Sequence, residues 1–384
     1  TAWYLKASKY IQNTKIKVAF VSTNSIVQGE QVGILWKELF SNYGIKIHFA
    51  HQTFNWSNEA KSNAAVHVVI IGFAQFDSTN KRIFEYENIK SNAHEKSAKN
   101  INAYLVEGDD IVIEKRRKPL CNVLNIIKGN YYAKSEGLII EEKDLDYLVK
   151  NEPNAKKWIK LLIGADEFIN NRKRYCLWLV DCPPDELRKM PLVMERVNRV
   201  REDRLKSTDK GMQNLAPIRF RETNNPDKCI VIPVVSSEKR PYIPIGFIDK
   251  NTISTNGNLI IPNGDLFLFG QLTSLMHMAW VKYTCGRLKS DYRYSKDLVY
   301  NNYPFPKNVS EKQKKAVEEK AQNVLNIRSQ FSDCSLADLY DPLSMPPNLK
   351  KAHQELDKAV DNCYGSKSFK NDKERIEFLF GLYE

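Results

Sequence analysis

The sequence has few of the features that mark secreted, metal-binding or membrane proteins. Its seven cysteines are spread from Cys121 to Cys363, with no Cys-x-x-Cys pair and no histidine nearby. Disulfide frameworks and zinc sites need closer spacing, so we expect neither, nor any other bound metal. No apolar run approaches the roughly 20 residues that cross a bilayer, and Thr1 to Lys6 lack the order of a signal peptide. We therefore expect a cytoplasmic protein without a membrane partner.

The sequence also lacks a recognisable cofactor cradle and catalytic loop. No glycine-rich loop follows a predicted strand in the first 150 residues, where dinucleotide and adenosyl cofactors usually bind. Residues 181–185, Asp-Cys-Pro-Pro-Asp, imitate the Asn/Asp-Pro-Pro-aromatic loop of amino-methyltransferases, but no aromatic residue follows to stack on a flipped base. We interpret Pro183 and Pro184 as a helix start. We thus expect no catalytic residue, no bound cofactor and no small-molecule substrate in this chain.

The composition is that of a folded protein with an uneven charge. With 384 residues, of which 42% are hydrophobic and 27% charged, the chain is not disordered. Its length suggests roughly two to three domains. The formal net charge is +12, and residues 150–300, with 26 basic and 17 acidic side chains, hold three quarters of it. A concentrated basic excess indicates a polyanionic partner, although a similar charge also keeps ordinary proteins soluble.

The first 118 residues predict part of an α/β sheet. The expected elements are, in order, a helix, a buried strand, a helix and two strands, at residues 2–12, 17–22, 30–40, 45–50 and 65–73. The last two strands are joined by the polar residues 52–63, which leave no room for a crossover helix, so they should pair antiparallel. This order is typical of the C-terminal part of a doubly wound, Rossmann-like α/β sheet that ends in an antiparallel hairpin and whose first half is missing.

A charged stretch that ends near residue 118 separates this sheet from an α+β domain with many loops. In that domain we expect helices at residues 154–163, 185–206 and 271–285, and strands at 175–180, 229–235, 242–248, 258–262 and 265–269. A small helical C-terminal segment follows, with expected helices at residues 310–331, 347–364 and 372–382.

Four loops of the middle segment interleave Arg and Lys with Tyr, Ser and Asn. They are residues 217–221, 236–242, 254–258 and 286–295. Cations and hydroxyl groups bind phosphates, and forked donors or carboxylates read base edges. Each loop alone could be an ordinary solvated loop. Together they favour binding to double-stranded DNA, with an RNA-binding surface and a protein-interaction domain as alternatives.

Several blocks of sequence are more specific. They are residues 20–31, 54–61, 65–73, 164–170, 236–248, 276–280, 286–295, 300–304 and 337–342. These blocks resemble MmeI-like type II restriction-modification enzymes, and the resemblance covers nearly the whole chain. It implies a single polypeptide with an N-terminal nuclease, a helical spacer, an adenine-N6 methyltransferase that uses S-adenosyl-L-methionine, a target-recognition domain and a C-terminal helical segment.

The resemblance places the nuclease, the cofactor motif and the Asn-Pro-Pro-aromatic loop before Thr1. It assigns residues 1–118 to the C-terminal part of the methyltransferase domain, 119–309 to the target-recognition domain and 310–384 to the helical segment. It also implies that S-adenosyl-L-methionine binds elsewhere in the parent protein and that this fragment alone is inactive. The expected partners are double-stranded DNA and the N-terminal remainder of the same polypeptide.

The resemblance further implies a base-stacking aromatic residue in the loop before the terminal strands. Phe54 matches that position best, with Trp56 close behind, and their polar neighbours predict a loop. A base pulled out of the duplex loses stacking that an aromatic face replaces. Either ring could instead belong to the core.

Lys289 and Asp291 are our first candidates for base contacts. Two residues apart in an extended segment, their side chains would point the same way, which suits a G·C pair. A surface ion pair is the alternative. Asn256 and Tyr242 are further candidates. The cations that we expect to contact phosphates are Arg219, Arg221, Lys239, Arg240, Arg287 and Arg293.

The function expected from these observations is sequence-specific DNA recognition within an adenine-specific DNA methyltransferase of a restriction-modification system. A non-catalytic DNA specificity module that acts in trans on separate subunits is one alternative. An RNA-binding or scaffold domain is another.

Overall fold

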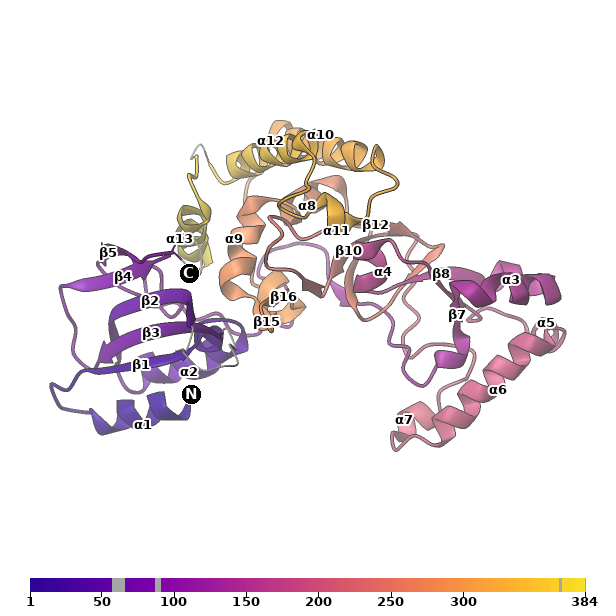
Figure 1. Ribbon diagram of the computed structural model, residues 1–384, viewed down its shortest axis with the longest axis horizontal. Helices are drawn as coiled ribbons and strands as arrows, with labels where there is room; N and C mark the ends of the chain where they lie inside the picture. Colours follow the sequence, from indigo (N-terminus) through magenta and orange to yellow (C-terminus); the bar gives the residue numbers. More distant parts are fainter. Residues whose placement is uncertain (57–65, 87–90, 366–367, 384) are drawn as a thin grey trace. The chain divides into compact units, whose positions relative to one another are not determined.

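The computed structural model describes residues 1–56, 66–86, 91–365 and 368–383. The chain forms two compact units, and each unit is discontinuous in sequence. Unit 1 comprises Thr1–Asn122, Leu275–Asn308 and Asp361–Glu384, and unit 2 comprises Val123–Ser274 and Val309–Val360 (Figure 1). The two units are described separately below. Our three-segment division at residues 118 and 309 stays a prediction.

Unit 1 is built on a five-stranded sheet in the order β1-β3-β2-β4-β5 (Figure 1). Its strands are β1 (Val18–Thr23), β2 (Lys46–Trp56), β3 (Val66–Ala74), β4 (Lys81–Glu85) and β5 (His94–Ala98). The predicted antiparallel pairing of β2 with β3 is confirmed. Because β3 also pairs antiparallel with β1, the strands β1 and β2 run parallel with β3 between them. The mixed α/β character that we predicted is therefore present.

Helices α1 (Ala2–Tyr10) and α2 (Glu30–Ser41) pack on this sheet. The α2 side chains at helical spacing, Val32, Leu35, Trp36 and Leu39, are all fully buried, as their periodicity predicts. Each such side chain contributes about 2 kcal/mol by leaving water. The α1 ring of Tyr4 stacks on Phe73 of β3 at 5.4 Å.

The start of α2 packs against a segment far away in the sequence. Gly29 precedes α2 with φ 61°, and a Cβ at this position would lie 2.9 Å from the Cα of Gly286. Only glycine fits both the left-handed backbone and this close approach. Gly286 begins a hairpin of β15 (Gly286–Leu288) and β16 (Asp291–Arg293), so part of the middle segment is built into unit 1.

The C-terminal helix α13 (Asp372–Tyr383) also belongs to unit 1, where it packs on α9 (Leu275–Thr284). Ion pairs join Lys373 to Glu85 of β4 and Lys282 of α9 to Asp372. Phe380 lies against Trp280, with ring centroids 5.9 Å apart. The end of the chain therefore stabilises the unit that its beginning forms.

Unit 2 contains two four-stranded sheets, in the orders β12-β10-β14-β6 and β13-β8-β9-β7. The strands are β6 (Ile127–Lys128), β7 (Ile139–Glu141), β8 (Ile159–Ile163), β9 (Arg174–Leu177), β10 (Lys228–Pro233), β12 (Gly246–Asp249), β13 (Thr252–Ser254) and β14 (Asn258–Pro262), with a short β11 (Val235–Ser236). The smaller helices of this unit are α3 (Glu142–Asn151), α4 (Ala165–Asn170), α5 (Pro184–Arg188), α6 (Pro191–Leu205) and α7 (Lys210–Gln213).

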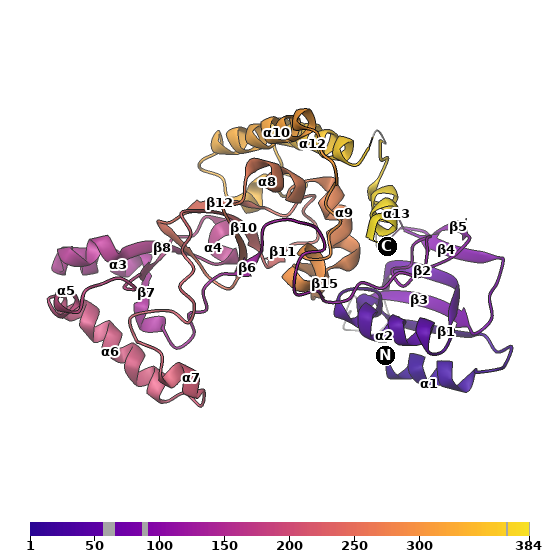
Figure 2. The same ribbon diagram turned by 180° about the vertical axis from the view of Figure 1, so that it is seen from behind.

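The long C-terminal helices α10 (Glu311–Ser329) and α12 (Pro347–Cys363) lie over α8 (Leu266–Leu272), with the short α11 (Leu336–Leu339) between them in sequence (Figures 1 and 2). A Cβ at Gly270 of α8 would meet side chains of both long helices at 2.7 to 3.3 Å. The glycine thus allows the three helices to pack closely. Among the described residues, no helix is long and apolar enough to cross a membrane.

Three predicted elements of unit 2 were wrong. The expected helix over 154–163 is a 3-10 helix, Pro153–Trp158, followed by strand β8, because a short apolar run does not distinguish helix from strand. The expected strand over 265–269 is helix α8, which Asp265 caps by accepting a hydrogen bond from the Leu268 N–H at 2.8 Å. The strand expected over 242–248 begins only at Gly246, since Pro241 and Pro244 have no N–H to donate.

Candidate nucleic-acid interface

The predicted site residues divide equally between the two units. Unit 1 holds Phe54, Trp56, Arg287, Lys289, Asp291 and Arg293, and unit 2 holds Arg219, Arg221, Lys239, Arg240, Tyr242 and Asn256. The loops of the middle segment are thus divided between the two units. Four of the unit 1 residues share the β15–β16 hairpin, and the other two are neighbours on β2.

Phe54 and Trp56 lie in a strand, which corrects our prediction of a loop. Strand β2 continues through both residues, and Trp56 still pairs with Val66 of β3. An irregularity in the pairing between His51 and Phe54 marks a β-bulge. Trp56 is 44% exposed and Phe54 is half-buried. Residues 57–63 of the predicted polar loop lie outside the described residues.

Three further rings, which sequence reasoning missed, form a connected group with Phe54. Tyr86 stacks on Phe54 at 5.1 Å, and His51 stacks on Phe84 at 4.1 Å. The hydroxyl of Tyr86 is hydrogen-bonded to Nδ1 of His51 at 2.8 Å. Burial lowers the pKa of His51 and raises that of Tyr86, so both groups are neutral at pH 7. The spacing of two residues between Phe84 and Tyr86 was the available signal that both rings lie on one face.

The β15–β16 hairpin changes the geometry that we predicted for Lys289 and Asp291. Leu288 pairs with Asp291, so Lys289 occupies the two-residue turn, where its φ is 58°. The segment is not extended, and the prediction that both side chains point the same way is wrong. Lys289 is exposed at the tip, while Asp291 is half-buried at the start of β16.

The two arginines of the hairpin differ in surroundings. The Arg287 guanidinium lies 4.0 Å from the ring centroid of Tyr292 and donates to the Ser290 carbonyl at 2.9 Å. This packing stiffens the hairpin. Arg293 is exposed. A stiff hairpin with a cation at its tip and another at its base can approach a polyanion without much loss of side-chain entropy.

In unit 2, a buried arginine fixes the loop that carries Arg219 and Arg221. Arg204 of α6 is 1% exposed, and all five of its N–H groups donate to oxygen atoms. The acceptors are the carbonyls of Lys134, Leu215, Ala216 and Arg219 and the hydroxyl of Ser135. Burial lowers the pKa of Arg204, yet an arginine stays charged. The Arg219 backbone is therefore held in place, while Arg221 is exposed.

Asn256 is exposed on a loop that is held by distant segments of unit 2. Its N–H donates to the Asn130 carbonyl at 3.0 Å, and the Thr255 N–H donates to the Ile163 carbonyl at 2.8 Å. A Cβ at Gly129 would lie 2.1 Å from the Thr255 carbonyl oxygen, so glycine is required there. The Asn256 amide, which can both donate and accept, therefore projects from a backbone of fixed position.

Tyr242 does not have the accessibility that our base-contact prediction requires. It is 4% exposed, its hydroxyl donates to the Asp357 carboxylate at 2.7 Å, and its ring stacks on His353 at 4.0 Å. The residue is instead an anchor in a buried network. Through Tyr340, whose hydroxyl lies 2.7 Å from Nε2 of His353, the network reaches Arg328.

This network holds the loop that carries Lys239 and Arg240. Arg328 of α10 donates to the Ile245 carbonyl at 2.5 Å, so the loop is anchored at its C-terminal end as well as at Tyr242. Lys239 is exposed, and Arg240 donates to the Ser236 hydroxyl at 3.4 Å. The C-terminal helices thus support a loop of the middle segment, which spacing along the sequence could not show.

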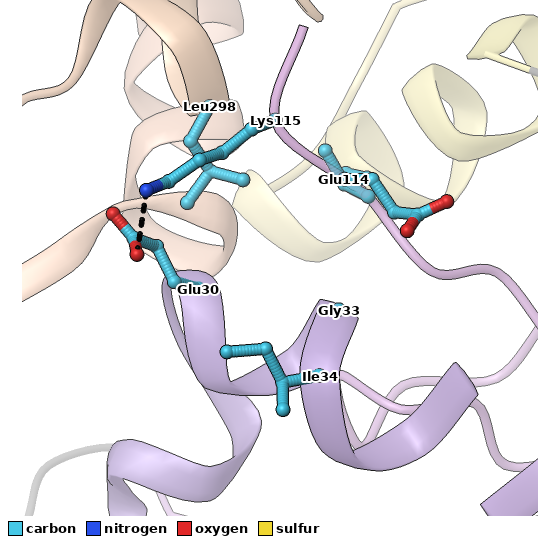
Figure 3. Close-up of a pocket in the computed structure, with 7 residues that line it drawn as sticks. Glu30, Gly33, Ile34, Glu114, Lys115 and Leu298 are labelled. Carbon is cyan, nitrogen blue, oxygen red and sulfur yellow. Dashed lines mark ion pairs between the residues drawn. The ribbon is translucent and has the colours of Figure 1, made fainter. Parts of the chain in front are cut away.

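A pocket of about 350 Å³ lies elsewhere in unit 1, between α2 and the segments near residues 113–115 and 298 (Figure 3). Its rim carries an ion pair between Glu30 and Lys115 at 2.8 Å. Both side chains are more than half exposed, so the pair contributes little. No predicted site residue lines this pocket, and the described residues contain no group of His, Cys, Asp and Glu suited to a metal ion.

Comparisons with known proteins support a nucleic-acid function. Three family models match, described as "MmeI, DNA-methyltransferase domain" at residues 1–85, "MmeI, target recognition domain" at 107–307 and "MmeI, C-terminal domain" at 309–384. DNA methyltransferase A of Bacillus subtilis (strain 168) is 42% identical over 388 residues, which cover all of this chain and 43% of that protein.

A solved structure is also similar over the whole chain. It is that of the type IIL restriction-modification enzyme MmeI in complex with DNA, with 47% sequence identity and a TM-score of 0.88. The match covers 100% of this chain and 51% of that one. The chain therefore spans about half the length of the relatives that it matches.

Proposed function

Because the chain belongs to the MmeI-like family of restriction-modification DNA methyltransferases, we propose that it supplies DNA sequence recognition to an adenine-N6 methyltransferase. The observation that carries the proposal is the match to the target recognition domain over residues 107–307. That segment largely overlaps residues 150–300, which hold three quarters of the net positive charge.

Phosphate contact is assigned to exposed cations on supported loops. Arg221 and Lys239 in unit 2, and Arg293 in unit 1, are exposed. Arg219, Arg240 and Arg287 are half-buried, and their guanidinium groups already donate to protein oxygens. We therefore expect the exposed cations to contribute more to the salt dependence of binding. Each phosphate contact releases counterions, and it steepens the fall of log affinity with log salt concentration by about 0.9.

Base contact is assigned to Asn256 in unit 2 and to Lys289 and Asp291 in unit 1. An Asn amide pairs with adenine in the major groove, a lysine with guanine, and a carboxylate with cytosine. Asn256 has the strongest structural support, since its loop is held by hydrogen bonds to Asn130 and Ile163. Tyr242 is left out of this assignment because it is buried.

Stacking on an extruded adenine is assigned to Phe54, with Trp56 beside it at 6.3 Å. The residues present do not fit S-adenosyl-L-methionine: β1 is followed by Asn24 to Gln28 without a glycine, and Gly29 packs on Gly286. We therefore assign the cofactor and the methyl transfer to the N-terminal remainder of the polypeptide. Since β1 is an outer strand of its sheet and its Val21 is 51% exposed, we expect that remainder to contact β1.

The test is binding of this chain to random-sequence duplex DNA, single-stranded DNA and duplex RNA from roughly 50 to 200 mM salt. We expect a preference for duplex DNA and a steep loss of affinity with salt. Preference for RNA, or no binding, would contradict the proposal and favour an RNA-binding or scaffold domain. An upstream reading frame without a methyltransferase motif would favour a specificity module acting in trans.

A further inference from the structure

Phe54 and three other rings form an arrangement of four side chains on β2 and at the end of β4. Tyr86 covers one face of Phe54, with ring centroids 5.1 Å apart and an interplanar angle of 22°. His51 lies flat on Phe84 at 4.1 Å and 6°. The hydrogen bond of 2.8 Å between the Tyr86 hydroxyl and Nδ1 of His51 joins the two stacked pairs. The four rings therefore form one connected group.

The β-bulge explains how Phe54 comes to share a face with His51. The two residues are three positions apart in sequence, and in a regular strand they would lie on opposite faces. On the partner strand β3, however, their partners Ile70 and Val68 are only two residues apart. The extra residue in β2 turns Phe54 back, and its ring centroid lies 6.1 Å from that of His51. Bulges often re-aim a side chain next to a functional site.

We propose that Tyr86 and His51 are positioning residues that set the ring plane of Phe54 and direct an unpaired base to its opposite face. This inference rests on the base-stacking role proposed for Phe54. Tyr86 occupies one face, so a base can stack only on the other. The hydrogen bond to His51 fixes the rotation of Tyr86, and the flat His51–Phe84 stack fixes His51 in turn. A platform of fixed orientation loses less entropy when a base stacks on it.

The experiment uses the full chain and a DNA duplex that carries one unpaired 2-aminopurine opposite an abasic site. Stacking quenches the fluorescence of this base, and the probe requires no knowledge of the target sequence. Phe54→Ala should abolish the quench. Tyr86→Phe keeps the ring and removes only the hydrogen bond, and should weaken the affinity for the unpaired base about threefold to tenfold. Tyr86→Ala should weaken it further.

Two controls separate positioning from general stability. Tyr10, which is 76% exposed on α1 of the same unit, supplies the matched variants Tyr10→Phe and Tyr10→Ala. Binding to the same duplex with a normal base pair should not change in Tyr86→Phe, nor should its salt dependence. A merely structural role would lower the melting temperature and weaken both duplexes equally.

The possible results distinguish the two proposals. If Phe54→Ala removes the quench but both Tyr86 variants behave like the wild type, the positioning role is wrong and base stacking by Phe54 stands. If the wild type gives no quench, or if Phe54→Ala retains it, the stacking role is wrong and the positioning role falls with it.

Discussion

The two units of the chain carry different candidate groups for binding a nucleic acid. Unit 1 offers the aromatic rings around Phe54 and a hairpin that carries Lys289 at its tip. Unit 2 offers exposed cations and the Asn256 amide on loops that buried arginines or backbone hydrogen bonds hold in place. Rings suit a base that has left the duplex, whereas cations and amides suit a duplex that is intact. Unit 1 thus combines rings suited to an extruded base with candidate cations suited to a duplex, whereas the candidate residues of unit 2 suit a duplex.

The supports of the two units differ as well. In unit 2, Arg204 and Arg328 each place a buried charge where backbone carbonyls accept from it. In unit 1, Phe54 is backed by other rings and by one hydrogen bond between neutral groups. Removing a buried charge leaves acceptors without donors, whereas removing a ring contact leaves mainly a cavity. Removing a supporting side chain should therefore lower the stability of unit 2 more than that of unit 1.

The largest expected effect comes from Arg204→Met, which leaves five acceptors, one in a buried and four in partly buried hydrogen bonds, without their donor. We expect the local stability of unit 2 to fall by about 3 kcal/mol or more. Hydrogen exchange of the backbone near residues 134–135 and 215–221 measures this loss, while exchange in unit 1 should stay as it was. Arg201→Met, at an exposed position of the same helix, is the matched control. If the backbone is equally protected from exchange in Arg204→Met and Arg201→Met, Arg204 does not support this loop.

Acid should weaken both units through one buried histidine each. Burial lowers the pKa of His277 in unit 1 to about 3 and that of His353 in unit 2 well below its usual range. The neutral form is favoured in the folded state, so this stability is present above pH 6.5 and is lost as pH falls below it. The expected loss is about 1.4 kcal/mol per pH unit for each histidine, which for His277 continues toward pH 3.

Replacing each histidine by itself shows which one causes the loss of stability in acid in its unit. His277→Gln should flatten the pH dependence of hydrogen exchange in unit 1, and His353→Gln should do so in unit 2. An unchanged slope in the unit that carries the substitution would show that other groups cause the acid sensitivity.

A smaller effect is expected from Asn256→Ala, which removes the amide but none of the backbone hydrogen bonds of its loop. Discrimination at one base pair should fall by about 1 to 3 kcal/mol, while binding to random sequence stays unchanged. Competition between duplexes that differ at single positions measures this loss of discrimination. Equal weakening on all duplexes would mean that Asn256 contacts the backbone instead.

The smallest effect is expected from Lys239→Ala. One lost phosphate contact should lower the slope of log affinity against log salt by about 0.9 and weaken all sequences alike. Lys9→Ala, an exposed lysine on α1 of unit 1, is the control. If the two variants have the same slope as the wild type, Lys239 does not contact DNA.

Local patterns in the sequence predicted those features that depend on neighbouring residues. The burial of Leu35 and Trp36 follows from helical spacing, and the pairing of β2 with β3 follows from two apolar runs too close for a crossover. Phe54 was expected in a loop because its neighbours are polar. A strand whose outer positions face solvent tolerates such neighbours, and the bulge that re-aims Phe54 leaves no mark in composition.

The arrangement in two units depends on contacts that sequence patterns do not contain. The close approach of Gly29 to Gly286 joins segments more than 250 residues apart, and Asp357 accepts from Tyr242 across 115 positions. Tyr242 closely follows the charged and polar residues 236–240, so it was expected at the surface. Its partner lies on a C-terminal helix, and no local pattern connects them. The sequence thus indicated which residue types could bind DNA, but it did not show whether each side chain is buried or exposed.

The most direct test of DNA sequence recognition is selection of bound sites from a duplex library with a randomised central segment. The account predicts that repeated selection by this chain converges on one short sequence, and that Asn256→Ala relaxes the preference at a single position of it. A chain that binds the library with a steep salt dependence but enriches no sequence would contradict the account, because its cations would then hold DNA without any side chain reading the bases.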